Sequence, residues 1–142
     1  MVNEMLKGIS TQLYDVFGAD YKYYVENVEQ KLQKPCFTID SILPLQRSRS
    51  RVLYDRTIPV VVHYFSNEKT TTKADCYSKA ELIVEALEYV PFHGALIRGE
   101  DISYQIVDDV LQVFVTYKFI TKKITSNEDD METLNVSNVS AL

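Results

Sequence analysis

Three arginines at alternate positions are the residues whose type and spacing first suggest chemistry. Arg47, Arg49 and Arg51 are separated by single serines in the stretch QRSRSR. If this stretch is extended, alternate side chains project from one face about 6.7 Å apart, and the three guanidinium groups form a row. In water, two unit charges at that distance repel by only about 0.6 kcal/mol, so such a row does not by itself require a binding partner.

Three interpretations of this row remain open. It can be a solvated edge strand or loop that charge protects from pairing with the wrong chain. It can be a protruding arm whose guanidinium forks bind carboxylates of a neighbouring subunit or of another protein. It can also bind nucleic acid, but the rest of the chain is not basic and the arm has no clear aromatic interleaving for stacking on bases.

The other candidate groups do not form a recognisable catalytic site. Gly94 and Gly99 have the spacing of a phosphate-binding loop, but Glu100 and Asp101 follow where Lys and Ser or Thr are needed. Close packing or a strand kink at Gly99 explains this spacing better. Of the paired acids, Asp108 with Asp109 fits a turn.

The cysteines and histidines do not predict a metal site. Cys36, His63, Cys76 and His93 lie far apart in the sequence, and none has a partner at the short spacing that structural zinc sites use. No serine lies in a Gly-x-Ser-x-Gly motif. We therefore expect a protein that is not an enzyme and that needs no cofactor or metal.

Composition and charge indicate one globular domain with an acidic extension. The chain has 142 residues, 46% of them hydrophobic and 25% charged, and a net charge of -5. Residues 126–142 contain four acids and no Lys or Arg, which leaves residues 1–125 at -1. We predict a single domain over 1–125 and a flexible acidic tail over 126–142. Charges at Glu4 and Lys7 do not fit a signal peptide, and no long apolar run fits a membrane span, so we expect a cytosolic protein.

Two helices are predicted. Apolar residues recur every three or four positions over about the first 17 residues, and Gly18 supplies a stop. Thr72 and Asp75 have the spacing of a capping box, and Pro91 would end the helix that follows. The apolar stripe of this second helix comprises Cys76, Ala80, Ile83, Val84 and Leu87, with Lys79, Glu81, Glu85 and Glu88 away from it.

Five extended segments are predicted around these helices. Two are YKYYVENV and PCFTIDSIL, and a third covers 51–65, where Pro59 suggests an edge position or a bulge. The last two form a long hairpin around Asp108 and Asp109, with alternating apolar residues from Leu111 to Phe119. The predicted fold is a two-layer α+β domain, in which a mainly antiparallel sheet of four to five strands carries both helices on one face. The other sheet face must then be polar or covered by something else.

The chain resembles a known family in three stretches. These are LYDRTIPVVVHYF, KADCYSKAELIVEALEYV and PFHGALIRGEDISYQIVDDVLQVFVTYKF. They are similar to the tail terminator proteins of long-tailed bacteriophages, prophages and phage-tail-like particles of Gram-positive bacteria. The likeness covers about residues 1–125. It departs from the family pattern at the hairpin, where Asp108 and Asp109 stand in place of an Asp-Gly pair.

The resemblance implies a structural assembly protein. Such a subunit forms a ring, usually of six copies, on the head-proximal end of the tail tube, where it stops tube growth and offers a docking surface to the neck or head. Its partners would be copies of itself, the tail tube protein, and sheath or neck proteins. It would be found in the host bacterial cytoplasm during assembly and then in the particle tail, and no membrane or sequence-specific nucleic acid is expected to bind it. The alternatives are another head–tail joining protein and a small nucleic-acid-binding protein.

We predict that Arg47, Arg49 and Arg51 contact an adjacent subunit or the tail tube.

Overall fold

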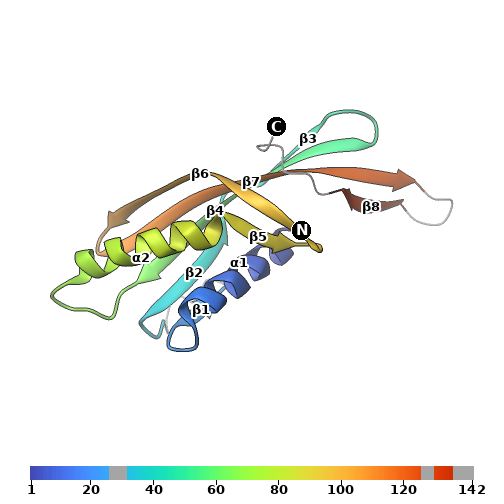
Figure 1. The fold of residues 1–142 in the computed structure, drawn as a ribbon. Helices are drawn as coiled ribbons and strands as arrows, with labels where there is room; N and C mark the ends of the chain where they lie inside the picture. Colours follow the sequence, from blue (N-terminus) through green and yellow to red (C-terminus); the bar gives the residue numbers. More distant parts are fainter. Residues whose placement is uncertain (26–31, 126–129, 136–142) are drawn as a thin grey trace.

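The computed structural model describes residues 1–25, 32–125 and 130–135, and these residues form an α+β fold (Figure 1). The elements follow in the order α1 (Val2–Phe17), β1 (Lys22–Tyr24), β2 (Cys36–Ser41), β3 (Leu45–Ser48), β4 (Leu53–Phe65), α2 (Thr72–Leu87), β5 (Tyr89–Phe92), β6 (Ala95–Val107), β7 (Val110–Thr125) and β8 (Asp130–Asn135). Both predicted helices are confirmed. Of the predicted acidic tail, residues 126–142, the structure describes only 130–135, which form β8. The other residues of the tail lie outside the described part of the chain.

The sheet has more strands than the sequence predicts. Eight strands form one sheet with the order β1-β2-β4-β7-β6-β5, in which β3 also pairs with β4 and β8 with β7. The pairs are antiparallel except for β1 with β2, so the sheet is mixed. The prediction of four to five strands is therefore too low. It misses β3 and β5, whose four residues each are too few for an alternation to be recognised, and β8, which lies in the segment predicted as an acidic tail.

The two helices pack against one face of the sheet (Figure 1). The first helix, α1, buries an apolar stripe that consists of Met5, Leu6, Ile9 and Leu13. Gly8 allows it to approach β5 closely, because a Cβ at that position would lie 2.6 Å from the carbonyl oxygen of Pro91. The predicted stripe of α2 is also buried, with Val84 partly so. The helix ends at Leu87, and Pro91 lies beyond it in β5.

The predicted capping box at the start of α2 is wrong. No side chain caps this helix, and the Thr72 hydroxyl donates to the carbonyl oxygen of Glu68 in the preceding turn. Asp75 instead accepts hydrogen bonds from the hydroxyl groups of Tyr64 and Ser66, both at 2.6 Å. Its carboxylate therefore ties α2 to the end of β4 rather than to its own backbone.

The strands β4 and β7 form the centre of the sheet and pair in register from Leu53 with Lys122 to Phe65 with Val110. Pro59 lies within β4, where the sequence predicts an edge position or a bulge. The edge position is wrong for the strand, because β4 pairs with β7 along its whole length, but its pairing on the other side is interrupted beside Pro59, between the pairs Ser41 with Val60 and Leu45 with Thr57. The backbone explains why proline is tolerated. The carbonyl of Pro59 accepts a hydrogen bond from the Ile42 N–H, at the point where the neighbouring strand of β4 changes from β2 to β3. The N–H that proline lacks would point to the same side, so its absence does not interrupt the hydrogen bonds between β4 and β7.

Two tight turns close the hairpins. His93 and Gly94 join β5 to β6 with φ of 49° and 77°, and Asp108 and Asp109 join β6 to β7 with φ of 51° and 62°. Positive φ at both central residues is the geometry of the type I′ turn, whose twist matches the strands. The predicted long hairpin is confirmed, and the aspartates take the backbone conformation for which glycine or asparagine is usual.

Gly99 lies in β6 where the sheet meets the end of α2, as the interpretation of close packing requires. A Cβ there would lie 2.7 Å from the carbonyl oxygen of Leu87 and 2.6 Å from a methyl group of Val115. Its own N–H donates to the carbonyl of Glu88 at 2.7 Å. A register shift between Glu100 and Ser103 then bends β6.

Candidate functional site

The three arginines lie on a hairpin that we call the arm, residues 42–57. Figure 1 shows β3 and the start of β4 extending past the ends of both helices. The first strand of the arm, β3, ends at Ser48, and residues 49–52 form the turn that leads into β4. The predicted straight row is therefore wrong. Only Arg47 lies on a strand, while Arg49 and Arg51 lie in the turn, because the chain must reverse there to pair β3 with β4.

Arg49 is bound within the arm itself. Its Nη2 lies 2.9 Å from Oδ1 of Asp55, and its Nε donates to Oδ2 of the same carboxylate at 3.3 Å. This is the two-point contact that a guanidinium fork makes with a carboxylate. Both side chains remain partly exposed, so the pair contributes on the order of 0.2–1 kcal/mol. Its main effect is to hold the turn against β4.

Arg47 and Arg51 are exposed, and neither forms an ion pair with another described residue. Large apolar side chains are also exposed along the arm. Leu43 is 86% accessible to solvent, and the others are Ile42, Leu45 and Val52. Cations beside exposed apolar groups are typical of a surface that binds another macromolecule.

The basic surface continues from the arm onto β7. The register pairs Thr57 with Lys118 and Leu53 with Lys122, so both lysines lie on the sheet face opposite the helices, as does Arg47. Lys118 lies 3.9 Å from Glu100 of β6, whose Oε2 is buried and makes no hydrogen bond with the described residues. This face also carries the pair of Val61 and Phe114, which are buried and half-buried. This face is therefore not wholly polar.

His63 lies on the same face and stacks beside Phe65, with 6.4 Å between the ring centroids. Burial lowers the pKa of His63, although the nearby carboxylate of Asp40 opposes the shift. The imidazole is therefore neutral at pH 7.

The residues Cys36, His63, Cys76 and His93 are not assembled into a metal site, and no group of three His, Cys, Asp or Glu in the described part of the chain could hold a metal ion.

A second polar cluster surrounds Asp75. Its carboxylate accepts from Tyr64 and Ser66 and lies 3.2 Å from Nζ of Lys79. Burial alone would raise the pKa of Asp75, but the hydrogen bonds from Ser66 and Tyr64 and the charge of Lys79 outweigh it and hold this pKa below its usual value. The cluster is fully paired within the fold and acts as a structural connection between β4 and α2.

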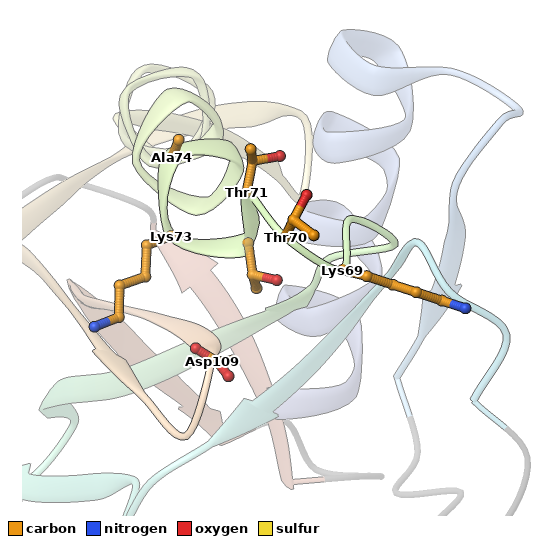
Figure 2. A pocket seen from close by; sticks show the side chains of 7 residues that line it. Lys69, Thr70, Thr71, Lys73, Ala74 and Asp109 are labelled. Carbon is orange, nitrogen blue, oxygen red and sulfur yellow. The ribbon is translucent and has the colours of Figure 1, made fainter.

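An open hollow of about 470 Å³ lies at the N-terminal end of α2 (Figure 2). Its lining residues are Lys69, Thr70, Thr71, Thr72, Lys73, Ala74 and Asp109. Figure 2 shows the amino groups of Lys69 and Lys73 pointing to opposite sides, with the Asp109 carboxylate on the side of Lys73. Two cations that diverge do not form a binding site for one anion.

None of the described helices is long and apolar enough to cross a membrane.

The comparison with protein families decides where this chain belongs. A family model described as "Phage tail terminator protein" matches residues 4–130. The chain belongs to the phage tail terminator family. The resemblance found in the sequence is thereby confirmed, and the match includes the arm, α1 from residue 4 onward, all of α2 and the strands from β1 to β7. Family membership gives the protein a structural role in a phage tail and associates it with other tail proteins.

The remaining comparisons add little to this tail terminator assignment. No curated protein matches the chain significantly. One solved structure, whose title is only a sequence identifier, has 12% sequence identity and a TM-score of 0.37, and the match covers 88% of this chain and 94% of that one. A likeness at this level carries no argument about function.

Sequence reasoning missed two features of this tail terminator surface. The first is Asp55, which binds Arg49 and reduces the free charge of the arm. The spacing in the sequence could have indicated this contact, because a carboxylate six residues after Arg49 lies beside that arginine once the chain forms a hairpin. The second is the contribution of Lys118 and Lys122, which only the pairing of β4 with β7 places beside the arm.

Proposed function

We propose that this tail terminator forms a ring, of six copies, at the head-proximal end of a phage or phage-like tail tube. The ring stops growth of the tube and presents the docking surface for the neck or head. The protein acts without catalysis and without a cofactor. It assembles in the cytoplasm of the host bacterium and remains in the tail of the finished particle.

The observation that carries this proposal is the family match over residues 4–130. The fold is consistent with it. One end of the sheet carries the helices, and the other end carries an arm with exposed cations and apolar side chains. A subunit whose two ends differ in this way can bind head to tail, and such contacts form rings when the rotation between subunits closes.

The test is the length of tails made without the protein. Deleting the gene in the phage or prophage that encodes it should produce tubes of variable and excessive length, and expression of the wild-type chain from a plasmid should restore a uniform length in negative-stain images. Normal tails in the deletion strain would refute the proposal. A gold-labelled affinity tag on the chain should mark the head-proximal end of each tail.

The same images separate this role from that of another head–tail joining protein. Tubes of correct length that fail to attach to heads would indicate a neck protein instead.

A competing function, binding of nucleic acid, would use the basic residues of the arm and of β7. A gel shift at physiological ionic strength would favour it, while a shift seen only at low salt would reflect unspecific attraction to phosphates.

A further inference from the structure

We infer that the arm of one copy docks on the acidic outer face of α2 in the next copy. The acidic face consists of Glu81, Glu85 and Glu88, and the arm supplies Arg47 and Arg51. The inference rests on the proposed ring and specifies which two surfaces close it. It commits to a second copy of this chain as the partner of the arm.

The acidic face is a continuous feature of α2. Glu81, Glu85 and Glu88 are exposed and follow one another at spacings of four and three, which places them on one side of the helix over about 10 Å. None of the three forms an ion pair with another described residue. Exposed apolar and aromatic side chains flank them, namely Tyr77, Leu82 and Tyr89. This surface therefore has the same mixed character as the arm, with the opposite charge.

The end of α2 lacks the charge that would stabilise it within one copy. The C-terminus of a helix carries a partial negative charge, which cations stabilise and carboxylates destabilise. The last turn of α2 contains no basic residue, and Glu85 and Glu88 lie in or next to it. Like charges at spacings of three and four add to the cost. Arginines from a neighbouring copy would remove both penalties.

The arm provides what this surface lacks. Arg47 and Arg51 are exposed and have no ion pair with a described residue, whereas Arg49 is held by Asp55 and keeps the turn in place. Two guanidinium forks can each bind a carboxylate at two points, which fixes orientation as well as charge. Leu45, two positions before Arg47 on β3, and Val52, which follows Arg51, are exposed and can pack on the apolar side chains of the acidic face.

The two surfaces cannot meet within one molecule. The arm extends past the ends of the helices, and α2 packs on the other half of the sheet (Figure 1). A contact between the arm of one copy and α2 of another uses two different patches, so each copy keeps one free arm and one free acidic face. Repetition of this contact closes a ring or continues as a filament.

Charge reversal tests the pairing directly. The arm variant Arg47→Glu/Arg51→Glu and the helix variant Glu81→Lys/Glu85→Lys should each abolish ring formation, while the chain carrying all four changes should restore it. An equimolar mixture of the arm variant and the helix variant should restore it as well, because every arm then faces a helix of opposite charge in an alternating ring. The control Asp20→Lys/Glu68→Lys changes the net charge as much as the helix variant does, at exposed positions outside the acidic face, and should assemble normally.

Site-specific cross-linking provides a readout that does not depend on stable rings. Cys36 and Cys76 are buried, so an introduced cysteine is the reactive one. Mixing an Arg51→Cys chain with a Glu85→Cys chain under mild oxidation should give several-fold more disulfide dimer than mixing it with an Asp20→Cys chain. The yield should fall as ionic strength rises, since salt screens exposed charges. Circular dichroism of each variant should match that of the wild type.

Equal yields with both partners would overturn the inference, as would rings formed by the arm variant alone. Neither result touches the proposed function, which tail length decides independently. If tails overgrow without the protein and the cross-link is absent, the capping role is right but the copies do not contact one another through these two surfaces. If the cross-link forms and tail length is unaffected by deletion, the contact is real and the capping role is wrong.

Discussion

The hydroxyl group of Tyr117 donates a 2.7 Å hydrogen bond to the carbonyl oxygen of Leu87. Leu87 is the last residue of α2, and the carbonyl groups at a helix end have no partner within the helix. Tyr117 lies in the middle of β7 and is completely buried. Burial raises the pKa of Tyr117, so the phenol keeps its proton and remains a donor. A strand of the sheet thereby caps the helix that packs on it.

Replacing Tyr117 by phenylalanine should lower the free energy of unfolding by about 1–2 kcal/mol. The ring would still fill the core, but the Leu87 carbonyl would be left buried without a donor. Urea unfolding followed by circular dichroism measures the difference. Tyr104→Phe is a suitable control because Tyr104 is 43% exposed, and it should have little effect. Equal stability of the two variants would show that the Leu87 carbonyl finds another partner.

Replacing Gly99 by alanine should destabilise the fold by about 1–3 kcal/mol, because the added methyl group would collide with the Leu87 carbonyl oxygen and with Val115. A backbone oxygen cannot move aside as a flexible side chain can. Thermal unfolding should show a lower midpoint for this variant. Leu96→Ala in the same strand, where the side chain is 63% exposed, should change the midpoint little. An unchanged midpoint for Gly99→Ala would mean that α2 does not approach β6 this closely.

Replacing Asp75 by asparagine should lower stability at neutral pH by about 1–2 kcal/mol, since a charged acceptor of two hydrogen bonds is lost. The pKa of Asp75 is lower in the fold than the usual value of 3.8, so the carboxylate stabilises the fold above pH 3.8. This contribution disappears as pH falls through the folded pKa. The difference between wild type and variant should therefore shrink in acid. A difference that stays constant from pH 7 to pH 3 would contradict the shift.

Introducing an Asn-Gly turn through Asp108→Asn/Asp109→Gly should raise the free energy of unfolding by about 0.5–1 kcal/mol. Both aspartates have positive φ, a conformation that strains most residues with a side chain and suits asparagine and glycine. Chemical denaturation can measure this gain. Asp109→Ala serves as the opposite case and should be destabilising, because alanine keeps the Cβ and loses the polar group. A loss of stability in the Asn-Gly variant would mean that the aspartates form contacts that offset their strain.

The sequence predicts the long elements well because each of them has enough residues to display a period. Both helices and the hairpin of β6 and β7 are examples, with every second residue from Leu111 to Phe119 buried. The four residues of β3 and of β5 are too few for such a pattern. The sequence cannot place Pro59 for another reason, since a proline is tolerated in β4 only because of which strand lies beside it in the sheet.

The candidate site was predicted only in part. Arg47, Arg49 and Arg51 were recognised from their spacing, but spacing could not show that the chain turns at residue 49 or that Asp55 returns to bind Arg49. Asp75 has the right spacing for a cap, and its actual role depends on Tyr64 and Ser66, which precede the helix. Relationships between distant segments require the register of the sheet.

The continuous pairing of β4 with β7 also determines how the molecule resists mechanical load. From the layer beneath the helices β4 runs into the arm, and β7 pairs with it along its whole length. A pull on the arm along the strand direction acts on the whole ladder of hydrogen bonds in shear, since those bonds lie across the strands. All of them share the tension, whereas a peeling force would break them one after another. In the ring that we propose, the arm would carry tensile force from one subunit to the next while the helical layer stays intact.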